Sequence, residues 1–304
     1  MVARERNEGP LFEHVVGDPA FAAVQTRLFG LAYRMLGSRA EAEDVVQDVY
    51  LRWHQSDHDA IENPEGWLVA VATRRSIDRL RSLKIERAAY HGPWLPEPLM
   101  RNAPPPPDRE LELSSDLSIA FLVLLERLSP EERAAFLLHD VFDADYRHIS
   151  KVLEKSEATC RQIVHRARER VQRDRKRFAT TEADRIGLLK KFTAAVEARD
   201  EAAVLELFAP DATWTADGGG RVPASPRAVV GAARIAKLVI GLMNRIYGTS
   251  ATLHLIEVNG EAGLCVRVGG TLRLVLTVET DGTRILAVWA VVNPDKLSPV
   301  PRPQ

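Results

Sequence analysis

The sequence predicts a multidomain protein in which two all-α domains are followed by one α+β domain. Three observations support this fold class. Apolar residues recur at helical spacing along most of the first half, a proline-rich stretch at 89–112 interrupts that pattern, and β-rich runs with turn signals fill the end of the chain. With 304 residues, 45% of them hydrophobic, the chain can supply a core to each of two or three compact units.

The composition argues against a membrane protein, a secreted protein and a protein stabilised by disulfides. No apolar run is long enough to span a membrane and the charged N-terminus does not resemble a signal peptide, so we expect a cytoplasmic protein without a membrane partner. Cys160 and Cys265 fall in different predicted domains, which argues against a disulfide framework. His54 and His58 have the spacing of a helical metal pair, but no third ligand lies nearby. We therefore expect surface positions for both histidines, and neither a metal nor another cofactor.

The first predicted domain, residues 10–88, is helical. The helical pattern extends from Phe12 to about Trp53, and Ser38 with Glu41 three residues later predicts a capping box inside it. The polar face of this second helix is acidic, and by itself such a face indicates only contact with solvent. Its central members are Asp44, Gln47 and Asp48.

A further helix is predicted after Asn63, because the following proline suits a helix entry. This helix continues to about Lys84. Trp67 is expected to pack inward, whereas Arg74 and Arg75 are not, so the helix changes from apolar to basic along its length, as in a helix that lies against nucleic acid.

Residues 89–112 are predicted to be a linker. Pro93 and the run at 104–107 forbid helix and favour extended polyproline geometry. Tyr90, Trp94 and Leu95 are costly to leave in water, so we expect this linker to dock on another part of the protein.

The second helical domain, residues 113–178, contains a predicted helix-turn-helix. Helix is expected over 111–128, and Ser129-Pro130 followed by two glutamates predicts a capped helix start. Residues 145–177 then give a short helix, a turn and a longer helix whose apolar stripe includes Cys160. Eleven Lys or Arg against five acidic residues make this stretch a candidate phosphate-binding surface. Its outward side chains can hydrogen-bond bases or phosphates, and they are Arg161, Gln162, His165, Arg166 and Arg168.

The third domain, residues 182–297, is predicted to combine helices with an antiparallel sheet. Asn259-Gly260 and Asp281-Gly282 mark hairpin turns. The expected helices cover 184–199, 202–208 and 228–246, and the expected strands cover 251–258, 263–268, 272–279 and 285–292.

Two blocks of the helical half resemble the sigma-70 family in its extracytoplasmic-function class. AEDVVQDVYLRW followed by NPEGWLVAVATRRSIDRLR resembles region 2, and residues 145–177 resemble region 4.2. The resemblance implies DNA-templated transcription initiation, with the RNA polymerase core and promoter DNA as partners. It also implies roles for single residues: Asp44, Gln47 and Asp48 for the polymerase β′ coiled coil, Asn63, Trp67, Arg74 and Arg75 for the −10 element, Arg161, Gln162 and His165 for −35 bases, and Arg166 and Arg168 for phosphates.

The third domain resembles the SnoaL-like fold, a cone of helices against a curved sheet. Together with three motifs, it makes the chain similar to the SigJ-type subgroup. That resemblance implies regulation in cis by the extension and no dedicated anti-sigma factor, and it leaves open whether the extension activates or inhibits. The motifs are Trp94-Leu95-Pro96-Glu97-Pro98, Asp217-Gly218-Gly219-Gly220 and Asn293-Pro294-Asp295-Lys296-Leu297.

An independent second activity is the alternative. SnoaL-like folds also serve as isomerases, cyclases and small-ligand binders, and Asp217, His254 and Arg267 are the titratable candidates for a cavity in the cone. Strand residues of a closed cone are mostly packing, and Gly218–Gly220 is typical of a turn. We therefore expect no enzyme, and a filled or apolar interior would favour regulation.

Overall fold

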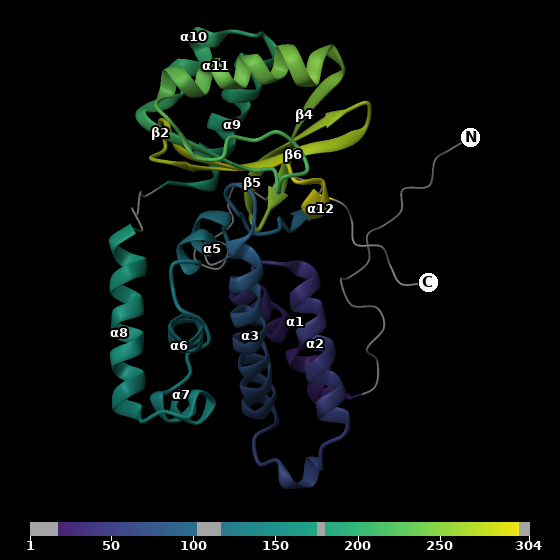
Figure 1. Cartoon of the computed structure of the whole chain (residues 1–304), viewed down its shortest axis with the longest axis vertical. Coiled ribbons are helices and arrows are strands. Elements are labelled where there is room, and N and C mark those ends of the chain that lie inside the picture. Colours follow the sequence, from purple (N-terminus) through teal and green to yellow (C-terminus); the bar gives the residue numbers. More distant parts are fainter. Residues whose placement is uncertain (1–17, 102–116, 175–179, 298–304) are drawn as a thin grey trace, which may run out of the picture.

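The structure is a computed structural model that describes residues 18–101, 117–174 and 180–297. Figure 1 shows the helices of the first half at one end of the molecule and a sheet covered by helices at the other. The segment 90–101 lies between the two ends. Within the described ranges, no helix is long and apolar enough to cross a membrane.

Three helices form the first bundle. Asp18 caps the first of them, and Gly37, with a left-handed φ of 67°, ends it. The helix start predicted at Ser38 within the helical pattern 12–53 is confirmed, and the part of that pattern before residue 18 lies outside the described residues. Asn63 caps the third helix, and Pro64 occupies its first position as predicted. The helices are α1 (Pro19–Leu36), α2 (Arg39–His54) and α3 (Pro64–Ala88), with a short 3-10 turn η1 (His58–Ala60) before α3.

Within residues 117–174, four helices form the second bundle. The capping box at Ser129 is confirmed, since Ser129 and Glu132 exchange backbone-to-side-chain hydrogen bonds of 2.9 and 3.2 Å. Of the helix predicted over 111–128, the described part is helical over Ile119–Leu125. The helices are α5 (Ile119–Leu125), α6 (Pro130–Asp140), α7 (Tyr146–Leu153) and α8 (Glu157–Asp174).

The two helical bundles share one hydrophobic core. Leu28, Leu68 and Leu80 of the first bundle belong to the same buried cluster as Phe136 and Ile149 of the second. Because packed apolar surface is the main favourable term in folding, the bundles are held together as one body in this closed arrangement.

The third domain is a seven-stranded sheet with the strand order β1-β4-β5-β6-β7-β2-β3. β1 belongs to the linker and pairs antiparallel with the edge strand β4. The strands are β1 (Met100–Arg101), β2 (Phe208–Asp217), β3 (Val229–Val230), β4 (Ala251–Val258), β5 (Glu261–Val268), β6 (Thr271–Thr280) and β7 (Ile285–Val291). The helices are α9 (Glu182–Glu197), α10 (Glu201–Glu206), α11 (Ala232–Leu242) and α12 (Pro294–Leu297), and α11 continues into a π-helical turn η2 (Met243–Tyr247) and a 3-10 turn η3 (Gly248–Ser250).

The prediction of a purely antiparallel sheet is wrong. β2 pairs parallel with β7, so the sheet is mixed. Strand β2 was missed because Pro210 and Asp211 interrupt its alternating pattern, and its register with β7 shifts between Phe208 and Thr213. The start of the helix predicted at 228 is the short strand β3, which Gly231, at φ 102°, separates from α11.

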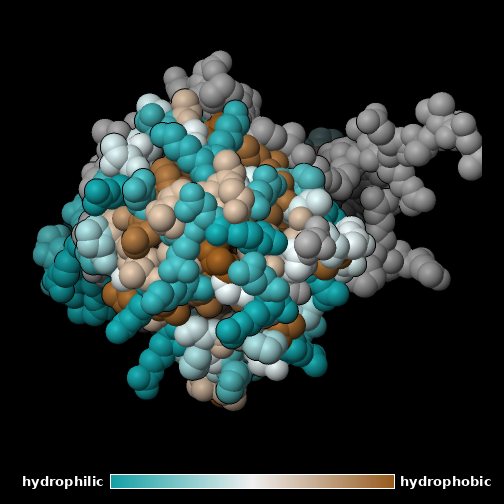
Figure 2. All heavy atoms as spheres, turned by 90° about the horizontal axis from the view of Figure 1, so that it is seen from above, coloured by the Kyte–Doolittle hydropathy of each residue, from teal (hydrophilic) through white to brown (hydrophobic). Residues whose placement is uncertain are grey.

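The two faces of the sheet have different neighbours. Helices α9, α10 and α11 cover one face, where Phe192 of α9 and Ile235 of α11 share an apolar core with Leu264 of β5. Leu95 of the linker, Ile119 of α5 and Leu297 of α12 pack on the opposite face. Seen from above, the helical side of this domain is largely hydrophilic, with apolar side chains showing between polar ones (Figure 2). The sheet is therefore the layer that joins the third domain to the rest of the chain.

Candidate functional site

Helix α8 presents the predicted DNA-reading residues on one exposed face. Ser156 Oγ accepts a hydrogen bond from Thr159 N at 3.1 Å, and Glu154, at φ 55°, forms the left-handed turn between α7 and α8. Cys160 is fully buried, as expected, and burial raises the pKa of its thiol. The apolar stripe of α8 fixes which way its outer face points. The side chains of Arg161, Gln162, His165 and Arg166 are exposed there.

Arg168 lies in a different environment. Its guanidinium donates to Asp140 Oδ1, with Nε at 2.7 Å, and lies 3.0 Å from His139 Nδ1. The Asp140 carboxylate raises the pKa of Arg168, because it stabilises the charged guanidinium. A phosphate contact by Arg168, predicted from the sequence, would have to compete with this ion pair.

We expect Arg161→Ala to weaken binding to the cognate −35 site by about 1–3 kcal/mol and to relax base preference there, since a base-edge contact carries sequence information. Arg173→Ala is the matched control, because Arg173 is an exposed arginine further along the same helix. Gel-shift titrations with matched and mismatched −35 duplexes measure both. Equal losses for the two variants would contradict the predicted register of α8.

The predicted polymerase-binding residues lie together on the exposed side of α2. Asp44, Gln47 and Asp48 are all exposed, and Leu51, 48% exposed, extends the same stripe by one turn. Partial burial and the neighbouring carboxylates raise the pKa of Asp44, with Glu41 the largest contributor among the carboxylates. This face of α2 therefore carries two carboxylates, the neutral amide of Gln47 and the apolar side chain of Leu51.

Reversing a charge on this face is expected to separate binding from stability. Asp48→Arg should weaken capture of core polymerase, while its free energy of unfolding changes by about 0.5 kcal/mol or less, because Asp48 is exposed and its nearest cation, Arg75, is 3.9 Å away. Pull-down with core polymerase and urea unfolding are the two measurements. Undiminished capture would place the polymerase surface elsewhere.

The four predicted −10 residues have different surroundings, and Arg75 lies beside α2, with Nε 3.9 Å from Asp48 Oδ2. Asn63 caps α3, and its Oδ1 accepts from Gly66 N at 3.0 Å. Trp67 is half-buried, 5.6 Å from the ring of Trp53. Arg74 instead reaches the second bundle, where it donates to Lys151 O at 2.8 Å and to Val152 O at 3.1 Å. A residue predicted to contact DNA is thus bound to α7 in this arrangement.

His54 and His58 are exposed, as predicted, although the His58 ring stacks on Trp53 at 4.0 Å and its Nε2 lies 2.8 Å from Trp53 O. The capping box predicted at Ser38 needs correction. At Ser38, Oγ accepts from Glu41 N, but the Glu41 carboxylate pairs with Arg79. The Glu41 carboxylate therefore does not complete the predicted capping box, and forms an ion pair between α2 and α3 instead.

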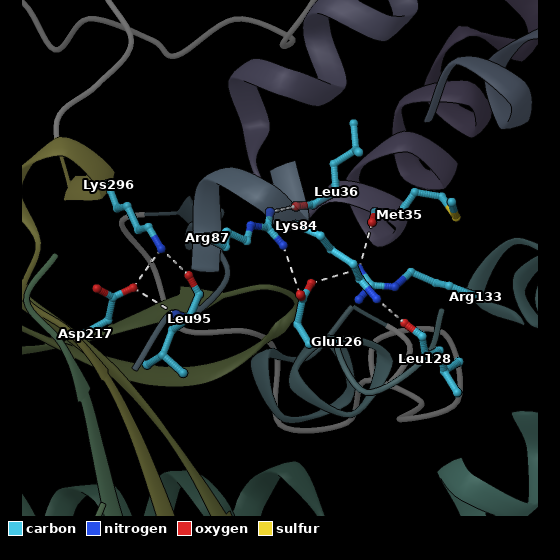
Figure 3. Close-up of polar contacts among 10 residues, drawn as sticks. All are labelled: Met35, Leu36, Lys84, Arg87, Leu95, Glu126, Leu128, Arg133, Asp217 and Lys296. Carbon is cyan, nitrogen blue, oxygen red and sulfur yellow. Dashed lines mark hydrogen bonds and ion pairs between the residues drawn. The ribbon is translucent and has the colours of Figure 1, made fainter. Parts of the chain in front are cut away.

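The linker and the third domain meet at a buried carboxylate, Asp217. Its Oδ1 accepts from the Tyr90 hydroxyl at 2.6 Å, and its Oδ2 accepts from Leu95 N at 2.8 Å and Lys296 Nζ at 2.7 Å. Lys296 also donates to Leu95 O (Figure 3). Burial lowers the pKa of Lys296 to about 8, and burial together with Asp217 raises that of Tyr90. The site therefore joins the linker, β2 and α12.

The three sequence motifs converge here. Asn293 Nδ2 donates to the Tyr90 hydroxyl at 2.9 Å. A Cβ on Gly219, which has a φ of 58°, would collide with the Asn293 amide, so the glycine leaves room for this bond. Arg221 and Asp295 form an exposed ion pair of 3.0 Å at the rim. Trp94 lies between two cations, with Arg87 Cζ 3.4 Å and Lys296 Nζ 4.2 Å from its ring centroid.

Asn259 is a functional residue that the sequence analysis missed. It was assigned only to a hairpin turn, and its φ of 54° fits that role. Its side chain also accepts from Leu99 N at 2.9 Å and donates to the Tyr33 hydroxyl at 2.7 Å and Leu117 O at 2.8 Å. One asparagine thus contacts the linker and both helical bundles. The sequence holds no signal for this, because Asn-Gly predicts a turn whatever surrounds it.

The other side of the linker contacts α2. Glu97 N donates to Gly37 O at 2.8 Å, and the Glu97 carboxylate accepts from Ser38 Oγ at 3.1 Å and Arg39 N at 2.9 Å. Tyr33 donates to Glu97 O at 2.6 Å. A carboxylate at a helix N-terminus is favourable for the free N–H groups and for the helix dipole.

A second buried ionic cluster joins the two helical bundles. Glu126 accepts from Arg87 at 2.9 Å and from Arg133 at 2.8 Å, and Arg133 also donates to Met35 O at 2.7 Å (Figure 3). Burial alone would raise the pKa of Glu126, but Arg133 and Arg87 hold it below its usual range. Lys84 adds a 2.8 Å bond to Leu128 O. The Glu126 carboxylate thus pairs with two guanidinium groups, that of Arg133 in its own bundle and that of Arg87 in the first bundle.

The candidate catalytic residues do not converge. Asp217 faces the linker, while His254 is exposed, with Nε2 2.9 Å from Thr252 Oγ1. Arg267 donates to Gly270 O at 3.2 Å. These three side chains do not form an acid–base set.

Comparison with known families agrees with this architecture. Residues 20–85 match the family model for sigma-70 region 2, residues 118–171 match that for sigma-70 region 4, and residues 189–293 match that for the SnoaL-like domain. The domains and their order define a sigma-70 factor with a SnoaL-like extension.

Similarity to individual relatives shows which class of sigma factor the chain belongs to. It is 35% identical to the ECF RNA polymerase sigma factor SigJ of Mycobacterium tuberculosis over 92% of this chain and 93% of the relative. It is 28% identical to SigI, a probable ECF sigma factor of the same species, over 95% and 97%. The crystal structure of Mycobacterium tuberculosis SigJ matches with a TM-score of 0.72 and 34% identity over 91% of this chain and 96% of that one. The chain belongs to the extracytoplasmic-function sigma factors, a class of transcription factors and not of enzymes, and its partners are the RNA polymerase core and promoter DNA.

Proposed function

We propose that this sigma factor is regulated in cis, with its SnoaL-like domain holding the linker so that regions 2 and 4 stay closed against each other. One observation carries the proposal: the segment 90–101 is bound by the first bundle, through Gly37 and Tyr33, and by the third domain, through Asp217 and Asn259. A segment held from two sides cannot extend without breaking contacts on one of them.

The closed arrangement conflicts with promoter binding. Regions 2 and 4 must spread to reach two promoter elements, yet here they share one core, and Arg74 is bound to α7. We therefore favour an inhibitory role over the alternative in which the extension braces an open factor. Polymerase binding through Asp44, Gln47 and Asp48 to the β′ coiled coil would supply the free energy for opening, in the cytoplasm and without a dedicated anti-sigma factor.

Small-ligand binding by the extension is the second candidate. An open groove of about 560 Å³ lies where α10, β2, β3 and the start of α11 meet, with exposed Leu205 and Val230 on its walls. Its place at the sheet edge away from β1 separates it from the linker contact. Ligand binding there would act on the extension without touching Asp217.

Distance measurements test the closed-to-open transition. Both native cysteines are buried, so fluorophores can be directed to Ser56→Cys, a half-buried position just after α2, and to Arg173→Cys, an exposed position on α8. Energy transfer between them is expected to be high in the free factor and to fall when core polymerase and a promoter are added. Transfer that is already low in the free factor would contradict the closed state.

A further inference from the structure

The third domain contacts the linker mainly through the linker's main chain. Asp217 accepts from Leu95 N and Lys296 donates to Leu95 O. Four residues later, Asn259 Oδ1 accepts from Leu99 N at 2.9 Å, and Asn259 N donates to Leu99 O at 2.8 Å. Both polar main-chain groups of these two linker residues are therefore bound by the extension.

The end of the linker extends this pattern by strand addition. Met100 pairs with Val258 and Arg101 pairs with Glu257 on the edge strand β4. An extended peptide that adds to a sheet edge while alternate side chains fill pockets is a general mode of peptide recognition. Here the pocket side chain is Leu95, which is 1% exposed and lies in the apolar cluster on the face of the sheet opposite α9, α10 and α11.

The groups that contact the linker are held by the extension itself. Val292 N and Asn293 N donate to Asp217 O at 2.9 and 2.8 Å, which fixes the end of β2. Asn259 is fixed by its two-residue turn. Asp217 and Asn259 are 0% and 2% exposed. If the linker left, buried polar groups would lose their partners, so the emptied groove would favour another peptide with the same main-chain spacing.

The opposite side of the linker belongs to region 2. Glu97 points to Ser38 and Arg39, and the Leu99 side chain packs against the core of the helical bundles, whereas the Leu95 side chain and the main-chain N–H groups of Leu95 and Leu99 face the extension. The contact with the extension can therefore form with a linker peptide that carries no region 2.

We propose that the groove formed by Asp217, Asn259 and Lys296 along the β4 edge is a peptide-binding site, and that its partner in trans is the linker of a second copy of this chain. This inference rests on the proposed function, since it takes the linker contact as reversible. The ligand class is an extended, proline-containing segment with leucine at the position of Leu95 and with main-chain N–H and C=O groups available four positions later, as at Leu99. In the closed factor the tethered linker occupies the groove at high effective concentration, and in an opened factor the groove is available.

The test uses a fluorescent peptide with the sequence of residues 89–101 and full-length protein, without polymerase or DNA. In the Leu95→Asp chain the tethered linker no longer fits. We expect this chain to bind the peptide at least tenfold more tightly than the intact chain, by fluorescence anisotropy. Adding Asn259→Ala should weaken that binding at least tenfold, and a peptide carrying Leu95→Asp should not compete.

If Leu95→Asp fails to fold, Trp94→Ala is the milder variant that loosens the tethered linker. It leaves Leu95 intact and removes a ring that lies against Gly37. Thermal unfolding establishes which variants are folded. No peptide binding to either folded variant, or equal binding when Asn259→Ala is added, would overturn the peptide site. If the peptide binds specifically but the linker variants leave promoter output unchanged, the peptide site stands and only regulation in cis is overturned.

Discussion

Glu126→Gln is expected to weaken the closed arrangement by about 3 kcal/mol, because removing one partner of a buried ionic cluster leaves the other charges uncompensated. The Glu126 side chain is 22% exposed, which places the effect at the lower end of the usual range for buried pairs. Arg87 and Arg133 would keep their positive charges, and Arg133 is 1% exposed. Urea unfolding measures the loss, and energy transfer between residues 56 and 173 reports opening.

Glu131→Gln is the matched control, since Glu131 also connects the bundles, through Arg81 at 3.1 Å, but at the surface. Exposed pairs contribute about 0–1 kcal/mol, so this variant should behave like the intact chain. Similar losses for both variants would show that burial of the Glu126 cluster is not what matters.

The Glu126 effect should depend on pH with a definite sign. Arg133 and Arg87 lower the pKa of Glu126 in the folded protein, so its contribution is present above the ordinary glutamate pKa, about 4.3. The contribution is lost as the pH falls through the folded-state value. The stability difference between the intact chain and Glu126→Gln should therefore persist at pH 7 and shrink in acid below pH 4.3. A difference that grows on acidification would contradict this assignment.

Much of the helical architecture follows from local signals. Capping at Ser129, helix entry at Pro64 and the apolar stripe of α8 are properties of neighbouring residues, and each is present as predicted. Hydrophobic periodicity, caps and turn residues act within one helix or hairpin, so they can be recognised before the fold is known.

The contacts between domains could not be predicted in the same way. Docking of the linker was expected from Trp94 and Leu95, but nothing near Asn259 or Glu126 in the sequence indicates that these residues connect domains. Strand β2 was hidden by Pro210, and the ion pair of Arg168 with Asp140 joins residues on different helices. Such pairings depend on tertiary packing, which propensity and periodicity do not encode.

Removal of the extension addresses regulation directly. Ending the chain after Val292 removes α12 and two partners of the linker, Asn293 and Lys296, but keeps β7. Ending it near Thr180 removes the whole sheet and leaves Leu95 and Ile119 without their apolar partners. Both truncations are expected to favour the open factor.

The short truncation should raise promoter output at least tenfold at limiting core polymerase. It removes the charge-assisted hydrogen bond from Lys296 to Leu95 O of the linker, worth about 1.5–3 kcal/mol, and 1.4 kcal/mol corresponds to a tenfold change in an equilibrium. Trp94→Ala should act in the same direction, because it removes the ring between Arg87 and Lys296. Asp295→Asn, which loses only an exposed ion pair, is the matched control in the same segment. Run-off transcription at equal protein abundance measures output, and truncations that transcribe like the intact factor, together with a silent Trp94→Ala, would rule out regulation in cis.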